Sequence, residues 1–149
     1  MRKDLSGKLV LDAGALVELT LSTASGLRLK NTLREGTVEA HTTELAILEL
    51  RYVLCRRLSQ VESDERVDKL LASGYIDVED LSPLIVDTAR DKCERAISLP
   101  DCCSLALARR LQCSVLFARR ERELVAEMNL KAFDVPILFL EDHKSTTSS

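Results

Sequence analysis

The sequence contains no tryptophan, and aromatic residues make up only 3% of its 149 residues. A core built from this chain must therefore consist mostly of aliphatic side chains. Hydrophobic residues account for 46% and charged residues for 30%, a composition that excludes an intrinsically disordered chain. Long apolar runs are also missing. The first apolar run begins at Leu9, and it is far too short for a signal peptide or a membrane span.

The charge balance and the cysteines narrow the class of protein further. A net charge of −3 excludes a globally basic nucleic-acid-binding chain, although it allows local basic patches. The five cysteines are odd in number and form no C-x-x-C pair, which argues against a disulfide framework or a tetrahedral zinc site. We therefore expect a reduced, cytoplasmic protein, with a disulfide of the kind found in hyperthermophiles as the alternative.

Several common active-site motifs are absent. The sequence has neither G-x-G-x-x-G nor G-x-x-x-x-G-K-[ST], so the usual loops for dinucleotides and triphosphates are missing. Only two histidines occur, His41 and His143, and nothing in the sequence places either beside a cysteine. A Cys–His nucleophile is therefore not indicated.

Short apolar runs alternate with helical segments along the chain. This alternation predicts a three-layer α/β/α sandwich with a short, mostly parallel central sheet. We expect one domain over residues 1–142 and a disordered tail over residues 143–149. Strands are expected at 8–12, 38–41, 75–78, 114–118 and 136–140, the last at an edge because proline cannot donate to a ladder. Helices are expected from 15 to about 21, and at 27–35, 44–58, 63–73, 83–97, 100–111 and 121–129.

Acidic residues follow two of the expected strands. Asp12 ends the first strand, and Glu121 and Glu123 come shortly after the strand that ends at Ala118. Because ligands of open parallel sheets gather at the carboxyl ends of the strands, we expect these acids at one edge. The structural alternative for Asp12 is a turn residue before glycine.

Glu49 lies on an apolar face of the expected 44–58 helix. At 100° per residue, one stripe contains Glu49 and the apolar residues Leu45, Leu48, Tyr52 and Cys55. A carboxylate in such a stripe is costly unless a cation or hydrogen-bond donors compensate it. The alternative is a Glu at the edge of the stripe that reaches water or pairs with Arg51 or Arg56.

Asp101 begins another expected helix, whose inner face includes Leu105 and Ala108. This face would carry the carboxylate toward the crevice that holds Asp12. The alternative is an N-cap, which satisfies a free backbone N–H and needs no functional explanation.

The four acidic side chains indicate a function only if the fold brings them close together. Two unit charges about 4 Å apart repel by about 4 kcal/mol at an effective dielectric constant near 20. Several carboxylates in one cleft therefore need protons or metal ions. Carboxylate oxygens suit Mg²⁺ or Mn²⁺, and such ions activate water for displacement at phosphorus. The acidic edge thus suggests phosphoryl-transfer chemistry.

Four segments of the sequence resemble the PIN domain, the ribonuclease fold of VapC-type toxins and archaeal-type relatives. They are residues 9–16, 43–54, 99–108 and 114–124, and in this order they place the resemblance over residues 9–140. The resemblance implies a metal-dependent endoribonuclease that hydrolyses RNA phosphodiester bonds with Mg²⁺ or Mn²⁺. It also implies a homodimer and a small antitoxin partner, as in a toxin–antitoxin pair.

The resemblance also implies the site residues. Asp12, Glu49 and Asp101 match the first three acids of the family, as catalytic residues and metal ligands. At the fourth position the family commonly has Thr-x-Asp, where this chain has Ala118-Arg119-Arg120. The fourth acid therefore moves to Glu121, with Glu123 as the competing choice.

Basic residues and a second apolar stripe complete the predictions. Arg119, Arg120 and Arg122 flank the expected site and would contact RNA phosphates, unless they form only a solvated helix start with local ion pairs. The 44–58 helix has two apolar stripes, so we expect one to pack on the sheet and the other to pair protomers. The alternative functions are a catalytically weak or inactive PIN-like module that binds RNA or protein, and a small phosphatase-like enzyme.

Overall fold

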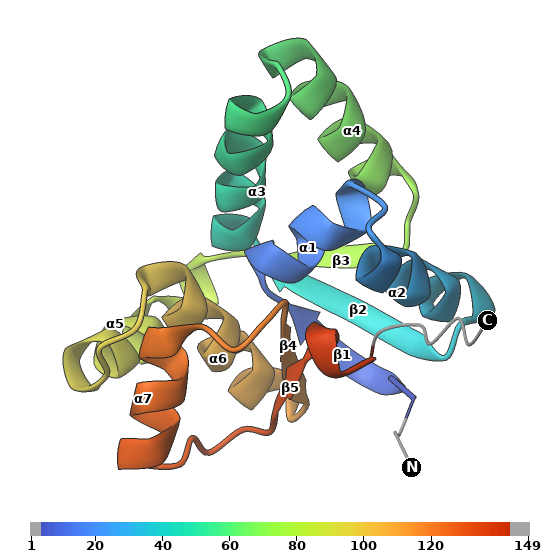
Figure 1. Cartoon of the computed structure of the whole chain (residues 1–149). Coiled ribbons are helices and arrows are strands. Elements are labelled where there is room, and N and C mark those ends of the chain that lie inside the picture. Colours follow the sequence, from blue (N-terminus) through green and yellow to red (C-terminus); the bar gives the residue numbers. More distant parts are fainter. Residues whose placement is uncertain (1–3, 144–149) are drawn as a thin grey trace.

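The computed structural model describes residues 4–143, which form a five-stranded sheet covered by helices (Figure 1). The strands lie in the order β3-β2-β1-β4-β5, and all four pairings are parallel. The predicted parallel sheet is confirmed, with β5 at an edge as expected. The strands are β1 Gly7–Leu11, β2 Val38–Thr43, β3 Ile76–Glu79, β4 Ser114–Phe117 and β5 Ile137–Phe139.

The helices occupy the segments between the strands, as the alternation predicted. Among the described residues they are α1 Ala13–Thr20, α2 Ala24–Glu35, α3 Glu44–Arg57, α4 Gln60–Ala72, α5 Ile85–Glu94, α6 Leu99–Leu111 and α7 Arg122–Leu130, with short 3₁₀ helices η1 Ser82–Leu84 and η2 Leu140–His143. Helices α3 and α4 form a pair that projects from the sheet (Figure 1).

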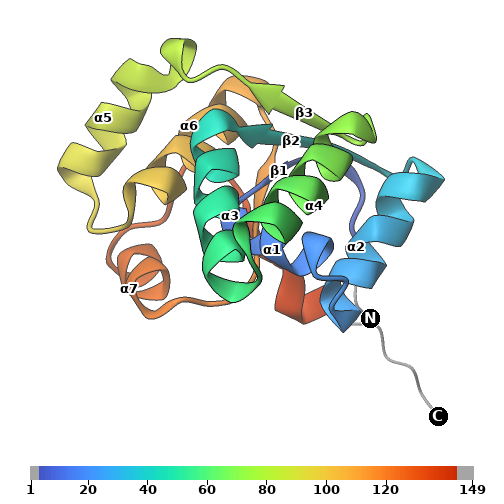
Figure 2. The ribbon, with the colours of Figure 1, turned by 90° about the horizontal axis from the view of Figure 1, so that it is seen from above.

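The two faces of the sheet contribute to separate hydrophobic cores. Leu9 and Leu11 of β1 join Leu116 of β4 in the core under α1, α2, α3 and α4. Val10 and Val115 point the other way, into the core lined by α6, α7 and Leu84 of η1. This alternation follows from the two-residue period of a strand buried on both faces. The result is the predicted three-layer α/β/α sandwich (Figure 2).

Capping residues explain where the helix starts differ from the predictions. Helix α2 begins at Ala24 rather than residue 27, because the Thr23 hydroxyl accepts a hydrogen bond from the amide of Gly26. Helix α4 begins at Gln60 rather than residue 63, because Ser59 caps it in the same way. The expected helix at 83–97 was wrong at both ends. Residues 82–84 form a 3₁₀ turn without a side-chain cap, and α5 ends at Glu94.

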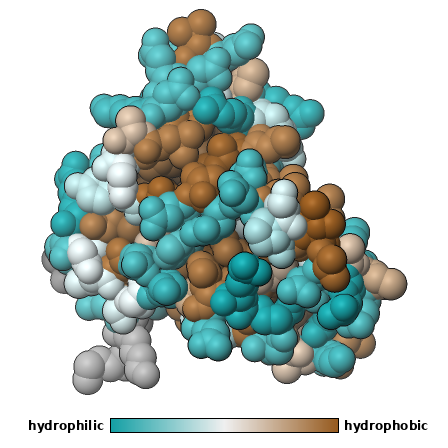
Figure 3. Space-filling model, turned by 180° about the vertical axis from the view of Figure 1, so that it is seen from behind, coloured by the Kyte–Doolittle hydropathy of each residue, from teal (hydrophilic) through white to brown (hydrophobic). Residues whose placement is uncertain are grey.

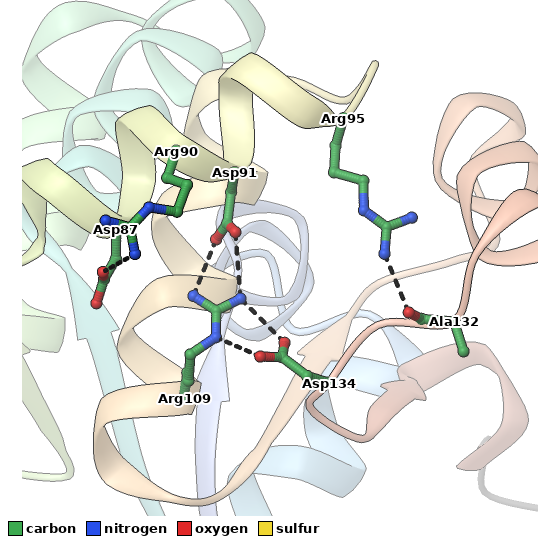
Figure 4. Close-up of polar contacts among 7 residues, drawn as sticks. All are labelled: Asp87, Arg90, Asp91, Arg95, Arg109, Ala132 and Asp134. Carbon is green, nitrogen blue, oxygen red and sulfur yellow. Dashed lines mark hydrogen bonds and ion pairs between the residues drawn. The ribbon is translucent and has the colours of Figure 1, made fainter.

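Helix α6 is fixed by Arg109, whose guanidinium lies between two carboxylates (Figure 4). It donates to both oxygens of Asp91 on α5, at 3.1 and 3.2 Å. It also donates to both oxygens of Asp134, which precedes β5, at 2.7 and 3.0 Å. Such paired contacts are stronger than single ones and set orientation. Arg109 therefore joins α5, α6 and the segment before β5.

Arg95 makes a second connection on the same side of the molecule. It donates to the backbone carbonyls of Glu127, Lys131 and Ala132, and its guanidinium lies 3.9 Å from the ring centroid of Phe133. The contact with Ala132 is drawn in Figure 4. A cation at the carboxyl end of a helix satisfies carbonyls that have no partner within the helix. Arg95 thus attaches the end of α7 to α5.

Two further predictions concern the termini and membranes. The tail was predicted to begin at His143, but this residue is the last one of η2. Residues 144–149 lie outside the described part of the chain. Within residues 4–143, no helix is both long enough and apolar enough to cross a membrane.

Replacing Arg109 with methionine is expected to lower the free energy of unfolding by about 1–3 kcal/mol, because the side chain of Asp91 is only 16% exposed and would lose its charged partner. Arg90→Met is the matched control, since Arg90 is 67% exposed and has a single 3.9 Å contact with Asp87. Urea unfolding of both variants measures the difference. Equal losses for the two variants would contradict this role of Arg109.

Candidate active site

The carboxyl ends of β1, β2 and β4 lie side by side at the point where the order of the strands in the sheet reverses. Strands β2 and β3 follow on one side of β1, whereas β4 and β5 lie on the other. This switch point is where open parallel sheets bind ligands. Asp12 lies directly there, because its amide donates to the carbonyl of Leu116 on β4, and the hydroxyl of Thr42 on β2 donates to the carbonyl of Leu11.

Asp12 is both the N-cap of α1 and a strongly perturbed acid. Its Oδ1 accepts a hydrogen bond from the amide of Ala15 at 2.8 Å, so its local role is to cap α1 rather than to form the turn before glycine that the sequence suggested. Burial raises the pKa of Asp12 to about 8, and the charges of Asp101, Glu121 and Glu49 contribute to the rise. The hydrogen bond from Ala15 acts in the opposite direction. Capping therefore explains its place but not its acidic surroundings.

Asp101 lies in the first turn of α6, and the alternative that it caps this helix is wrong. The cap is Ser98, whose hydroxyl accepts a hydrogen bond from the amide of Asp101 at 3.3 Å. Burial raises the pKa of Asp101 to about 6, and Glu121 and Glu49 are among the acids that add to the rise. The Asp101 carboxylate is thus free of the capping role that sequence alone allowed.

Glu49 projects from α3, which begins after the predicted N-cap Thr43. It accepts a hydrogen bond from the hydroxyl of Tyr52 at 3.3 Å, and it has no ion pair within residues 4–143. The alternative pairing is not formed: Arg51 binds Asp64 and Asp68 of α4, and Arg56 lies over the Tyr52 ring. Burial, followed by the charge of Glu121, raises the pKa of Glu49.

Glu121 is the acid that links the others. It is exposed, and it precedes α7 without using its side chain to cap that helix. Its charge raises the pKa of Asp12, Asp101 and Glu49, whereas Glu123 acts on Asp101 and comes last among the causes there. The electrostatics therefore favour Glu121 over Glu123 as the fourth acid.

A close contact brings the segment after β4 against the start of α1. A Cβ atom placed on Gly14 would lie 3.0 Å from the Cβ of Ala118 and 3.4 Å from Oδ2 of Asp12. Real Cβ atoms essentially never come closer than this, so the absence of a side chain at position 14 permits the approach. The segment that leads to Glu121 thus lies beside Asp12.

The three predicted phosphate-binding arginines differ from one another. Arg119 and Arg122 are exposed and form no ion pair with any residue in the range 4–143. Arg120, in contrast, is bound to Glu141 and Asp142 of η2, and its guanidinium lies over the Phe139 ring. No local pattern indicated this pairing, because the partners lie about twenty residues away.

The sequence did contain one signal that we missed. Ser98 and Asp101 have the spacing of a capping box, in which the first residue caps and the fourth returns a side-chain contact. This signal would have placed Ser98 at the N-cap and the helix start at Leu99.

The four acids suit a hard divalent cation in their chemistry but are not drawn together around one. Within residues 4–143, no three His, Cys, Asp or Glu side chains are grouped closely enough to hold a metal ion. Burial raises the pKa values of Asp12, Glu49 and Asp101, and the charges of the other acids add to the rise. Carboxylate oxygens are the ligands that Mg²⁺ and Mn²⁺ prefer.

Comparison with solved structures identifies several similar folds. PAE2754 from Pyrobaculum aerophilum is 17% identical, with a TM-score of 0.59, covering 90% of this chain and 92% of that one. VapC20 from Mycobacterium tuberculosis, described as a sarcin–ricin loop-cleaving toxin, is also 17% identical, with a TM-score of 0.62 and coverage of 79% and 93%. DNA-bound VapBC from Salmonella typhimurium is 15% identical, with a TM-score of 0.62 and coverage of 89% and 98%.

Sequence comparison gives two further findings. No curated protein matches the chain. The family model described as PIN domain matches residues 9–135, which include all four acids, the whole of β2, β3 and β4 and most of β1. Together with the VapC-type structural neighbours, this match confirms the resemblance inferred from the sequence. The chain belongs to the PIN domain family.

Proposed function

We propose that this protein is a metal-dependent endoribonuclease that hydrolyses RNA phosphodiester bonds. PIN domains are typically nucleases, and PIN nucleases generally need divalent metal ions. One observation carries the proposal for this chain: acids from β1, α3, α6 and the segment before α7 influence one another electrostatically. Such an arrangement is unfavourable by itself and favourable around a cation.

Asp12, Glu49, Asp101 and Glu121 are the residues that would hold Mg²⁺ or Mn²⁺, directly or through water. The chemistry that such an ion supplies is activation of water and stabilisation of the negative charge that develops on phosphorus. Asp12 is the most firmly placed of these residues, because the amide of Ala15 holds one of its oxygens. Glu121 is exposed, so its long side chain is the one with most freedom to move toward an ion.

Arg119 and Arg122 supply the contacts to RNA phosphates in this proposal. Both are exposed beside the acids and have no ion pair in the described part of the chain, so their guanidinium groups are available. Arginine forks match phosphate geometry, and each phosphate contact makes binding weaken as salt rises. RNA is therefore the proposed substrate class, and the acids are the proposed catalytic residues.

Replacing Asp12 with asparagine is expected to stabilise the protein in the absence of metal. The pKa of Asp12 is raised from 3.8 to about 8 in the folded state, so the folded protein binds more protons than the unfolded chain between these values. Wild-type stability contributed by this group is therefore present below pH 4 and is lost as pH rises toward 8. The Asp12→Asn variant keeps the cap without the charge, and we expect its melting temperature to exceed wild type by several degrees at pH 8.

Thermal melts with chelator between pH 5 and 8.5 measure this effect, and the advantage of Asp12→Asn should grow with pH. Asp12→Ala is the control, because it also removes the charge but loses the cap, at a cost of about 1 kcal/mol. A saturating concentration of Mn²⁺ should remove the advantage of Asp12→Asn. An advantage that shrinks as pH rises would contradict the raised pKa.

Cleavage of single-stranded or structured RNA is expected with Mn²⁺ and not with chelator. Asp12→Asn and Asp101→Asn should each lower the rate by about a hundredfold or more, because each removes a ligand charge where charge develops in the reaction. The rate of product formation on labelled RNA measures this. Cleavage that survives either substitution would point to a contaminating nuclease.

Two paired measurements define the site further. Glu121→Gln should lower cleavage more than Glu123→Gln, because Glu121 acts on three of the other acids. Calorimetry with Mn²⁺ separates turnover from binding. Tight Mn²⁺ binding without cleavage of any RNA would favour the catalytically inactive module, for which the replacement of Thr-x-Asp by Ala118-Arg119-Arg120 is the supporting observation. Turnover of an aryl phosphate would favour a phosphatase-like enzyme.

We also propose that the exposed face of α3 pairs two protomers. Helix α3 buries Ala46, Leu50 and Leu54 against the first core, while Leu48 and Tyr52 are 59% and 43% exposed. The rear of the molecule shows further hydrophobic side chains gathered beneath the α3–α4 pair (Figure 3). Apolar area of this kind is stabilised when a partner covers it.

Light scattering at micromolar concentration is expected to give the mass of a dimer. Leu48→Gln should shift this equilibrium toward the monomer, because it removes apolar area at the centre of the exposed stripe. Val61→Gln is the matched control on α4, since Val61 is 67% exposed and lies outside the stripe. A monomeric wild-type mass would rule out the dimer.

An antitoxin partner is the remaining part of the proposal. The structural neighbours include VapBC from Salmonella typhimurium and FitAcB from Neisseria gonorrhoeae, the latter 16% identical with a TM-score of 0.58. Identities this low support a shared fold alone. From that shared fold we propose that this chain also binds a small antitoxin protein. We further propose that residues 1–142 act as a single domain with such a partner. A short adjacent reading frame for a DNA-binding protein would support this.

A further inference from the structure

Arg120 is held by the 3₁₀ helix η2 through an unusually complete set of contacts. Its two terminal nitrogens donate to the two oxygens of Asp142 at 2.6 and 2.7 Å. One of them also donates to Glu141 at 3.2 Å, and the guanidinium lies 4.5 Å from the ring centroid of Phe139. The fork and one face of the guanidinium are therefore already occupied, so this side chain is poorly placed to bind an RNA phosphate.

The backbone around Arg120 is fastened to the same helix. The amide of Arg120 donates to Glu141 at 3.1 Å, and the amide of Glu141 donates to the carbonyl of Ala118 at 3.0 Å. A tight turn follows, in which the amide of Glu121 donates to the carbonyl of Arg119 at 2.9 Å. The main chain at Ala118 and both main chain and side chain of Arg120 are therefore fixed by η2.

This attachment determines the position of the Glu121 backbone. Ala118 also lies against the first turn of α1, beside Asp12, so the segment is confined between α1 and η2. Glu121 follows Arg120 directly and makes no capping bond of its own. Among the described residues, no ion pair or capping contact holds the Glu121 side chain, so its position depends on the backbone that carries it.

We propose that Arg120 is a positioning residue: bound by Glu141 and Asp142, it fixes the segment that presents Glu121 to the acid site. This inference rests on the proposed nuclease function, since it concerns the fourth acid of that site. In this proposal the contacts to RNA phosphates come from Arg119 and Arg122, while Arg120 binds η2.

The sign of one measurement separates positioning from a simple charge effect. Removing a positive charge near a cation site should tighten the binding of Mn²⁺, because like charges repel. Loss of a positioning contact should weaken it, by about tenfold or more. Arg120→Met is thus expected to lower Mn²⁺ affinity in calorimetry of the whole chain. Arg120→Lys keeps the charge but not the fork, and it should also weaken binding.

The controls use neighbouring arginines and a partner residue. Arg119→Met and Arg122→Met remove the same charge without touching η2, so neither should weaken Mn²⁺ binding. Asp142→Asn should weaken it in the same direction as Arg120→Met, and it carries the test if Arg120→Met does not fold. The double variant should be no weaker than Arg120→Met alone, because Arg120→Met already removes the contact between Arg120 and Asp142.

RNA cleavage at several salt concentrations gives an independent readout. Arg120→Met should leave the salt dependence of KM unchanged, whereas loss of a phosphate contact lowers the slope by about 0.7–0.9. Unchanged or tighter Mn²⁺ binding by Arg120→Met would overturn the inference and leave the proposed nuclease standing. Wild-type protein that binds no Mn²⁺ and cleaves no RNA would overturn both.

Discussion

Mutual repulsion among carboxylates at the carboxyl edge of the sheet is the constraint on which this structure depends. Folding brings Asp12, Glu49, Asp101 and Glu121 into electrostatic range, and burial is the largest cause of the raised pKa values of the first three. The fold has to maintain this arrangement against the tendency of the acids to separate. Hydrogen bonds that fix backbone positions, such as those at Asp12, supply part of that resistance.

The remainder comes from contacts outside the acid site. Arg109 joins α6, which carries Asp101, to α5 and to the segment before β5. Arg120 joins the segment before Glu121 to η2. Each arginine is bound by two carboxylates, so ion pairs outside the acid site hold the segments that carry the site's acids.

Local patterns were sufficient for the sheet and for most helices, and they singled out acids that the structure brings into electrostatic range. Alternating apolar runs predicted all five strands, and Thr43 was recognised as the start of α3. The sequence could not reveal the partners of Arg120, because Glu141 lies in an element whose position is set only by packing. The choice between Glu121 and Glu123 likewise depends on the three-dimensional path of the chain, which no local spacing encodes.

The contact between Gly14 and Ala118 has a consequence for how this chain can vary. With so little space between the two positions, a side chain at 14 would displace the strand end opposite it, even though α1 itself could accommodate one. The effect would be felt three residues further on, at Glu121. Positions 14 and 118 are therefore expected to vary together among homologous sequences, as a pair whose combined volume is limited.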